Sequence, residues 1–193
     1  MRICVYGAAS PVIDEEYIKK IEEFGRELVE RGHSLVFGGG GNGLMGAVAR
    51  GVREKDGQIL GVIPSFFSEE TIEVIYDKCD KLIETETMRQ RKQIMEENAD
   101  AFVVVPGGIG TLEEFFEILT LKQLLRHNKP IALYNVLGYY NEVFSVLKAA
   151  VDKRFIKDSV YDLFFISDDP KKVFEYVEKP DKEQRTIREL KDG

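Results

Sequence analysis

The sequence predicts an α/β protein with a Rossmann-like, doubly wound parallel sheet of about seven strands and helices on both faces. Apolar runs of strand length alternate with amphipathic stretches of helix length, which is the pattern of repeated βαβ units. Several strand candidates are continuous apolar runs, as expected for strands that are buried on both faces. Glycine-rich segments follow three of these strands, at the edge of the sheet where such folds bind ligands.

The predicted strands and helices alternate along most of the chain. Strands are predicted at 3–6, 34–37, 58–63, 81–84, 102–105, 131–134 and 163–166. Helices are predicted at 14–31, 43–56, 88–98, 112–127, 140–154 and 170–178. In the first of these helices, Ile18, Ile21, Leu28 and Val29 fall on one face, which indicates a helix that packs on the sheet.

The chain is predicted to form one nucleotide-binding domain over residues 1–180. It shows no internal repeat and no linker, and its 193 residues can bury a sizeable core. Residues 181–193 are almost all polar or charged and are predicted to form a charged C-terminal tail. Segment 64–80 is the least regular, and its pair Phe66-Phe67 suggests a turn followed by a mobile or partner-covered stretch.

The composition excludes several classes of function. A net charge of −7 argues against a general nucleic-acid surface. No apolar run approaches the ~20 residues that cross a membrane, and the N-terminus has a strand pattern rather than a signal-peptide pattern. Cys4 falls in a strand-like run and is interpreted as a core residue, and two cysteines make no disulfide framework. We therefore expect a cytoplasmic protein.

The most informative segment is the glycine-rich run from Pro106 to Thr111. It lies between an apolar strand and a helix, where backbone N–H groups and the helix dipole can bind a phosphate. Glu113 and Glu114 follow within the first helical turn. Carboxylates beside a phosphate do not help to bind it, but they suit a site that stabilises a cation or activates water. Thr111-x-x-Glu114 also fits a capping box, so a capping role and a ligand-facing role both remain open for Glu114.

Two further loops follow the first two strands. The first runs from Gly7 to Pro11, and its small residues and Ser10 hydroxyl suit a tight, ligand-facing turn. The second, Gly38 to Gly46, contains the dinucleotide pattern Gly-x-Gly-x-x-Gly. It follows the second strand rather than the first, and no acidic residue ends the next strand, which argues against NAD. Its four consecutive glycines either allow close packing or contact a ligand, and their cost in chain entropy favours the ligand. No P-loop pattern is present.

A cluster of cations precedes the predicted strand at 102–105. Thr87-x-x-Gln90 is a capping box, which predicts a helix start and places Arg91 and Lys92 in its first turns. Cations near a helix N-terminus oppose the helix dipole, so their presence hints at a function such as gripping phosphate. The alternative is that Arg89, Arg91 and Lys92 are solvated surface charges.

These motifs together resemble the LONELY GUY (LOG) family, the cytokinin-activating phosphoribohydrolases, whose members are sometimes labelled lysine decarboxylase-like. The resemblance covers residues 1–155. It rests on Pro106-Gly107-Gly108-x-Gly110-Thr111-x-x-Glu114 together with Met88-x-x-Arg91-Lys92. Further support comes from Gly38-Gly39-Gly40…Gly43-Leu44-Met45-Gly46, Val62-Ile63-Pro64 and Asn135-x-x-Gly138-Tyr139-Tyr140.

The resemblance implies a Rossmann-like homodimer or assembly of dimers that hydrolyses the N-glycosidic bond of a nucleoside 5′-monophosphate. The substrate would be a cytokinin riboside monophosphate or AMP, the products a free base and ribose 5-phosphate, and no cofactor or metal would be needed. Arg91 and Glu114 match the catalytic pair of the family. The residues expected to bind substrate are Gly7, Ser10, Gly39, Gly40, Met88, Lys92, Pro106, Gly107, Gly108, Ile109, Gly110, Thr111, Glu113 and Thr120.

Other functions fit the sequence less well or remain as alternatives. His33 and His127 are interpreted as structural or solvated, no zinc site or Gly-x-Ser-x-Gly elbow is assembled, and no lysine is marked for pyridoxal phosphate. A carrier of the molybdenum-cofactor type could use the same loops without hydrolysis, and a broad nucleotide 5′-monophosphate nucleosidase could act on several bases. The leucine-rich run at 119–125 either supports a dimer or packs on its own sheet.

Overall fold

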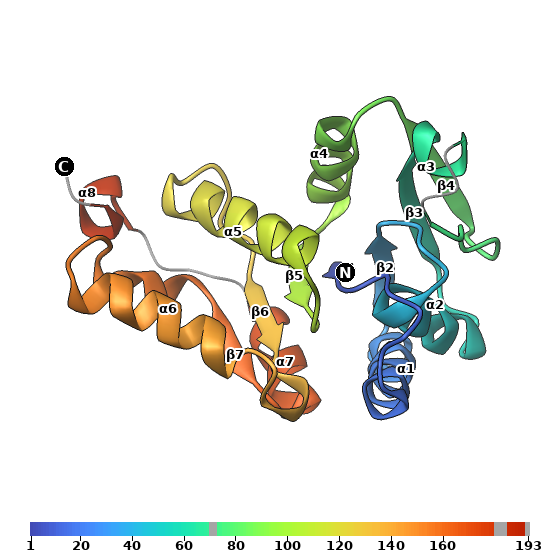
Figure 1. The fold of residues 1–193 in the computed structure, drawn as a ribbon, viewed down its shortest axis with the longest axis horizontal. Helices are drawn as coiled ribbons and strands as arrows, with labels where there is room; N and C mark the ends of the chain where they lie inside the picture. Colours follow the sequence, from blue (N-terminus) through green and yellow to red (C-terminus); the bar gives the residue numbers. More distant parts are fainter. Residues whose placement is uncertain (70–72, 180–184, 192–193) are drawn as a thin grey trace.

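The computed structural model describes residues 1–69, 73–179 and 185–191. It contains one sheet of seven parallel strands in the order β4-β3-β2-β1-β5-β6-β7, so the predicted fold class is confirmed (Figure 1). The strands are β1 Arg2–Tyr6, β2 Ser34–Phe37, β3 Ile59–Pro64, β4 Lys81–Thr85, β5 Ala101–Val104, β6 Ile131–Tyr134 and β7 Phe165–Ser167. The helices are α1 Glu15–Glu30, α2 Gly43–Glu54, α3 Ser65–Glu69, α4 Met88–Asn98, α5 Ile109–Gln123, α6 Asn141–Asp152, α7 Pro170–Val177 and α8 Ile187–Leu190.

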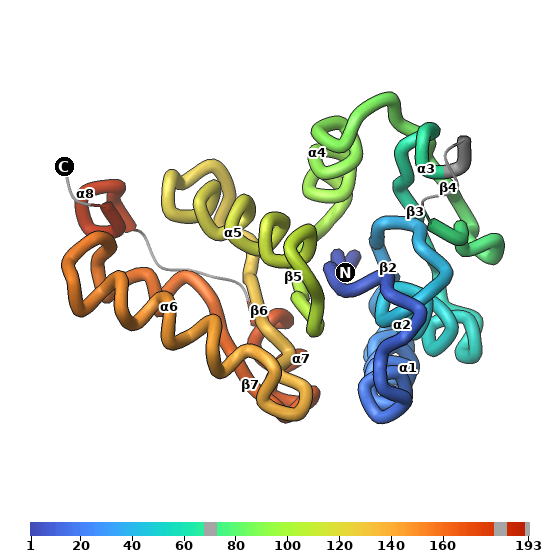
Figure 2. Tube along the Cα trace, viewed as in Figure 1, coloured from blue at the N-terminus to red at the C-terminus, as the bar shows by residue number. Residues whose placement is uncertain are grey.

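The sheet separates two apolar cores. Along β1, Ile3 and Val5 face one core while Cys4 and Tyr6 face the other, because successive side chains of a strand point to opposite faces. Helices α1, α2 and α7 cover the first face, and α4, α5 and α6 cover the second (Figures 1 and 2). Both faces are therefore buried over the central strands, as their continuous apolar runs predict, whereas the edge strands β4 and β7 are more exposed.

Three segments differ from the expectations or refine them. Helix α5 begins at Ile109 with Gly108 as its N-cap, so the capping box predicted at Thr111-x-x-Glu114 is wrong and Thr111 lies inside the helix. Part of the irregular segment forms α3, a short helix; residues 70–72 of that segment lie outside the described residues. Two short 3-10 segments, at Val136–Gly138 and Asp158–Leu163, flank α6.

The described part of the C-terminal stretch packs on the domain. Leu190 of α8 is 1% exposed and belongs to the core under α5 and α6. The Gln123 side chain donates a hydrogen bond to the Leu190 carbonyl at 2.9 Å, and Lys157 Nζ donates to the Arg188 carbonyl at 2.5 Å. Within this predicted charged tail, residues 181–184 and 192–193 lie outside the described residues. Among the described residues, no helix has the length and apolar character needed to span a membrane.

Candidate active site

The loops after β1 and β5 lie side by side at the carboxyl edge of the sheet, because β1 and β5 are neighbours in it. From β1 the chain adds β2, β3 and β4 on one side, and β5 then starts the other side with β6 and β7. The connections after β1 and β5 therefore run in opposite directions, and such a point in the sheet leaves a crevice. The two loops are tied together by a hydrogen bond of 3.1 Å from the Ala8 N–H to the Pro106 carbonyl. Two cavities open beside this bridge and share Ala8, Ser10 and Gly108.

The N-terminus of α5 presents free backbone donors to the site. Its N-cap, Gly108, supplies no side-chain bond, and the N–H groups of residues 109–111 have no acceptor in the described part of the chain. Gly107 lets this turn close, because a Cβ atom there would overlap the Thr111 side chain. The loop is held from below by two tyrosine hydroxyls: Tyr139 donates to the Gly107 carbonyl at 2.8 Å and Tyr140 to the Val105 carbonyl at 2.6 Å. Free backbone donors at a helix N-terminus on a fixed support have the geometry that can bind an anion.

Arg91 enters the site from α4, and its position is fixed by the sheet. The capping box predicted at Thr87 and Gln90 is present and starts α4 at Met88. The guanidinium donates to the Val62 carbonyl of β3 at 3.1 Å and to the Gly38 carbonyl, just after the neighbouring strand β2, at 2.9 Å. Arg91 is 4% exposed, so it is not a solvated surface charge. The third guanidinium nitrogen, Nη1, lies 3.9 Å from the Met88 sulfur, and both Arg91 and Met88 line the cavity.

Glu114 lies one turn further along α5 and lines the same cavity. Burial raises its pKa to about 7, because the charged carboxylate loses hydration there; the positive charge of Arg91 partly offsets this rise. A carboxyl group with a pKa near 7 can accept or donate a proton at physiological pH. Because α5 begins at Ile109, the capping role considered for Glu114 is wrong, and its ligand-facing role stays a prediction.

The cavity that holds these groups has a volume of about 350 Å³. Of the expected substrate-binding residues, it is lined by Gly7, Ser10, Met88, Gly108, Gly110, Thr111 and Glu113. Pro106 and Gly107 line the neighbouring cavity. The expected convergence of a guanidinium and a carboxylate on one cavity, beside a nest of amides, is therefore observed.

Five expected residues are not among the described residues that line either cavity: Gly39, Gly40, Lys92, Ile109 and Thr120. Lys92 instead pairs with Glu113 and Glu117 of α5, at 2.5 Å in each case. Ile109 is 89% exposed, and Thr120 is exposed on α5. For these residues a role in binding substrate remains an untested prediction.

Comparisons with known proteins show the family of this chain. A family model described as possible lysine decarboxylase matches residues 45–177. The chain is 38% identical over 177 residues to rice LOGL6, named a probable cytokinin riboside 5′-monophosphate phosphoribohydrolase, covering 92% of this chain and 70% of that protein. It is 42% identical over 155 residues to Arabidopsis thaliana LOG7, named a cytokinin riboside 5′-monophosphate phosphoribohydrolase, covering 80% of this chain and 70% of LOG7.

The chain belongs to the LOG family. Solved structures share its fold: the protein TM1055 matches with a TM-score of 0.70 at 23% identity, over 92% of this chain and 98% of that one. The molybdenum cofactor carrier protein of Chlamydomonas reinhardtii matches with a TM-score of 0.68 at 23% identity, over 92% and 95% of the two chains. At this identity the likeness shows the fold alone.

In this LOG-family chain, the glycine loop after β2 packs against other parts of the protein. A Cβ atom at Gly38 would overlap the Arg91 guanidinium, so glycine is needed there for Arg91 to reach its place. A Cβ atom at Gly40 would lie 2.9 Å from a carboxylate oxygen of Glu73. The loop also bonds to the segment after α3: the Gly41 N–H donates to the Val74 carbonyl at 2.6 Å. These contacts are the close packing that the sequence analysis gave as the alternative to contact with a ligand.

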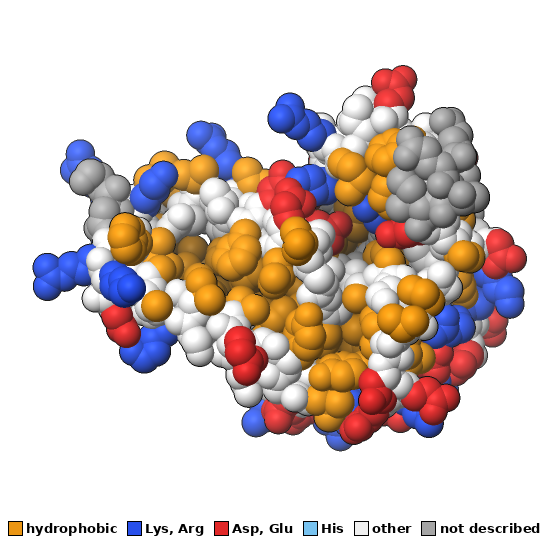
Figure 3. All heavy atoms as spheres, in the orientation of Figure 1, with side chains coloured by type: hydrophobic (Ala, Val, Ile, Leu, Met, Phe, Trp, Pro, Cys, Tyr) orange, Lys and Arg blue, Asp and Glu red, His pale blue; other side chains and the backbone are white. Residues whose placement is uncertain are grey.

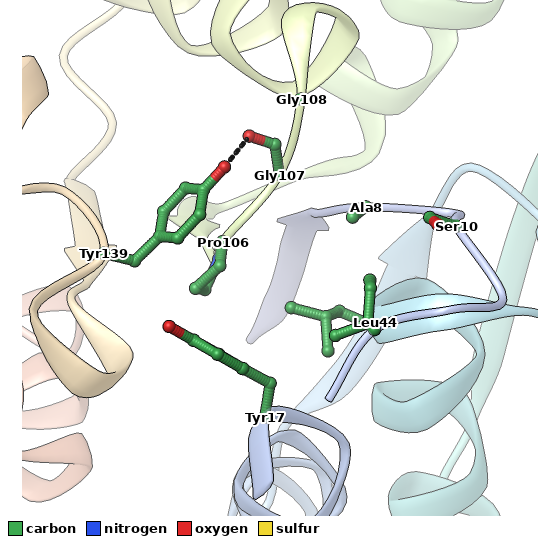
Figure 4. A pocket seen from close by; sticks show the side chains of 9 residues that line it. Ala8, Ser10, Tyr17, Leu44, Pro106, Gly107, Gly108 and Tyr139 are labelled. Atoms are coloured by element: carbon green, nitrogen blue, oxygen red, sulfur yellow. Dashed lines mark hydrogen bonds between the residues drawn. The ribbon is translucent and has the colours of Figure 1, made fainter. Parts of the chain in front are cut away.

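The neighbouring cavity of about 270 Å³ is mostly apolar and holds residues that were not predicted (Figure 4). Tyr17 from α1 and Tyr139 from the segment after β6 both line it, with their rings edge to face and the ring centres 6.3 Å apart, while the Tyr139 hydroxyl points to the Gly107 carbonyl. Leu44 of α2 and Pro106 complete its wall. Tyr139 belonged to a motif noted in the sequence, whereas Tyr17 carried no signal beyond its place at a helix start.

The two histidines lie away from both cavities, as predicted for structural residues. His33 contacts Glu178 at 2.9 Å through Nε2. His127 lies 2.9 Å from the Ile118 carbonyl through Nε2, and burial lowers its pKa to about 4. Cys4 is fully buried in the core, as predicted, and is not disulfide-bonded. Across the described residues, no group of three or more His, Cys, Asp or Glu side chains could hold a metal ion.

Proposed function

We propose that this chain hydrolyses the N-glycosidic bond of nucleoside 5′-monophosphates, giving a free base and ribose 5-phosphate. One observation carries the proposal: Arg91 and Glu114 line a single cavity whose adjoining wall is the open N-terminus of α5. The LOG relatives, named for cytokinin riboside 5′-monophosphates, support the same reaction class. AMP and its N6-isopentenyl derivative are the substrates we expect.

The 5′-phosphate would bind the free N–H groups of residues 109–111 at the start of α5. These donors carry the positive end of the helix dipole, which favours a dianion despite the net charge of −7. The neighbouring Ser10 hydroxyl lines both cavities and can add a further hydrogen bond. Binding energy from the phosphate then holds the ribose over Glu114, so that the scissile bond is placed by a group remote from it.

Cleavage of the bond between C1′ and the base nitrogen builds positive charge on the ribose ring. The ionised carboxylate of Glu114 would stabilise this charge and take a proton from the attacking water. The water oxygen bonds to C1′, and the electron pair of the breaking bond leaves with the base, which takes up a proton. Arg91 would bind phosphate oxygens or keep Glu114 ionised through its positive charge.

The test is to incubate the purified protein with AMP, GMP, CMP and isopentenyl-AMP and to measure free base by chromatography. We expect release of a purine, with ribose 5-phosphate in equal amount. No release from any of these nucleotides would reject the hydrolase. Release from all four at similar rates would favour the broad nucleosidase.

A carrier of the molybdenum-cofactor type is the alternative function. Its support is the likeness in fold to the Chlamydomonas carrier, whereas the Arg91 and Glu114 pair in one cavity favours hydrolysis. Molybdenum that stays bound through purification, together with no release of base, would favour the carrier.

We also infer a homodimer or an assembly of dimers in the cytoplasm. Figure 3 shows hydrophobic side chains gathered over α5 and α6, and the exposed apolar residues of this region include Phe116, Leu125, Val146 and Phe155. Contiguous apolar surface of this kind marks interaction sites. Two unpaired thiols suit a reducing compartment. Light scattering of the purified protein should give a mass of at least twice 22.0 kDa.

A further inference from the structure

A second carboxylate, Glu73, lines the cavity that holds Arg91 and Glu114. It lies in the segment between α3 and β4, and it belongs to neither of the motifs that contain Arg91 and Glu114. Its Oε2 atom is buried and has no hydrogen-bond partner among the described residues. Because a buried acceptor without a partner is costly, a native protein that keeps one has a reason to do so.

The position of Glu73 is built into the fold. The neighbouring residues 74–76 bond to the glycine loop through the Gly41 N–H to the Val74 carbonyl, 2.6 Å, and the Tyr76 N–H to the Gly39 carbonyl, 2.8 Å. Gly40 leaves room for the carboxylate, since a Cβ atom there would come within 2.9 Å of it and 2.8 Å of the Met45 methyl group. The glycine loop after β2 therefore holds the backbone next to Glu73 in place and leaves space for the Glu73 carboxylate in the cavity.

We propose that Glu73 accepts a hydrogen bond from the ribose 2′-hydroxyl of the bound nucleotide and so selects ribonucleotides over 2′-deoxyribonucleotides. This inference rests on the proposed function, because it assigns a substrate feature of the same site.

The chemistry of the cavity leaves this role for Glu73. A carboxylate repels the phosphate, so Glu73 belongs at the sugar end of the ligand. Glu114 already serves the reacting carbon, C1′, and the hydroxyl next to that carbon is the 2′-hydroxyl. Burial raises the pKa of Glu73, and the positive charge of Arg91 partly offsets this rise. Hydrogen bonds to this hydroxyl also strengthen as the ring gains positive charge, so they assist the reaction.

The experiment measures binding and turnover separately. Calorimetry compares ribose 5-phosphate with 2-deoxyribose 5-phosphate on the wild type, Glu73→Ala and Glu73→Gln. We expect the wild type to bind the ribose compound about tenfold more tightly, as a hydrogen bond to a charged group would give, and Glu73→Ala to lose that preference. In turnover, kcat for AMP should fall by about tenfold or more in Glu73→Ala, while kcat for 2′-deoxy-AMP changes little.

Two further variants guard the interpretation. Gly40→Ala should displace the carboxylate without removing its charge and should reduce the preference in the same direction. Asp77→Asn, an exposed acid of the same segment, should leave the preference unchanged. Equal wild-type affinity for the two sugars, binding of neither, or an unchanged preference in Glu73→Ala would overturn the inference. If the sugar preference is present but no nucleotide releases its base, the hydrolase proposal fails and the contact to the hydroxyl stands.

Discussion

The loop after β2 and the loop after β5 have the same local pattern and opposite uses. Each follows a buried strand, is rich in glycine and leads into a helix. At the start of α2, the N–H groups of Leu44 and Met45 both donate to the Ala8 carbonyl, at 2.8 and 3.2 Å. At the start of α5, the first N–H groups have no acceptor in the described part of the chain. The first helix end is closed by the protein, and the second is open to a ligand.

The comparison shows what a glycine-rich loop establishes and what it does not. Glycine indicates that some group comes close to the backbone, but the rest of the fold decides which group that is. At the β2 loop the approaching groups are Arg91 and Glu73, which are parts of the site itself. At the β5 loop the closest group is Thr111 of the same turn, and the outer side faces a cavity. The β2 loop thus builds the site, and the β5 loop is expected to bind the substrate.

The largest expected effect comes from the carboxylate beside the open helix end. Replacing Glu114 by Gln should lower kcat for AMP by about 10³-fold, because general acid–base and charge stabilisation are lost together. Affinity for ribose 5-phosphate should change little, since the phosphate donors remain. Glu97→Gln, an exposed acid of α4, is the matched control. Full activity in Glu114→Gln would remove Glu114 from the mechanism.

A substitution at the start of α2, the closed helix end, should change the stability of the protein. A Cβ atom at Gly46 would overlap the backbone carbonyl of Gly41, which cannot move aside as a flexible side chain can. We expect Gly46→Ala to lower the free energy of unfolding by about 3 kcal/mol, measured by urea denaturation. A loss below about 0.5 kcal/mol would mean that this loop is not tightly packed.

The pH dependence of the reaction should depend on both Glu114, at the start of α5, and Arg91, which is held beside the loop after β2. With Glu114 as the base, kcat/KM for AMP should rise with pH and level off above a pKa of about 7. Arg91 lowers this pKa, so Arg91→Met should move the rise to higher pH as well as reduce the plateau. A profile that stays flat from pH 5.5 to 8 would argue against Glu114 as the base.

The smallest change in stability is expected at the start of α5, the open helix end. A Cβ atom at Gly110 would meet nothing within 4 Å, and alanine restricts the unfolded chain more than glycine does. Gly110→Ala should therefore raise the free energy of unfolding by about 0.5 kcal/mol, the opposite sign to Gly46→Ala. Because Gly110 lines the cavity, the same variant should bind ribose 5-phosphate more weakly. Destabilisation by Gly110→Ala would show that this loop, too, is closed.

Much of the fold was predictable because it depends on periodicity. The seven strands and six longer helices were all expected, and the boundaries shift by only a few residues. The start of α5 was missed because Thr111-x-x-Glu114 fits a capping box, while the true cap, Gly108, has no side chain to signal it. The short helix α3 contains the aromatic pair Phe66 and Phe67, and the role of Phe67 becomes clear only in three dimensions: the centre of its ring lies 5.4 Å from the Arg91 guanidinium carbon.

The candidate site was predictable where a motif encodes it and not elsewhere. Arg91 and Glu114 came from paired motifs, and both line the cavity. Glu73 is in no motif, and its placement depends on hydrogen bonds between residues 74–76 and a loop more than thirty positions earlier. Lys92 shows the opposite case: it follows Arg91 directly, but the helical step turns it toward α5, where it neutralises Glu113 and Glu117.

The two carbonyl bonds to Arg91 have a consequence for recognition. A long side chain ordinarily loses rotational freedom when it binds a ligand, and this loss of entropy weakens binding. Here the guanidinium is held by the folded protein, through the Val62 carbonyl of β3 and the Gly38 carbonyl after β2. A nucleotide would thus meet a cation that is already in its working orientation, and the side chain should adopt one rotamer in crystals of the empty and occupied protein alike.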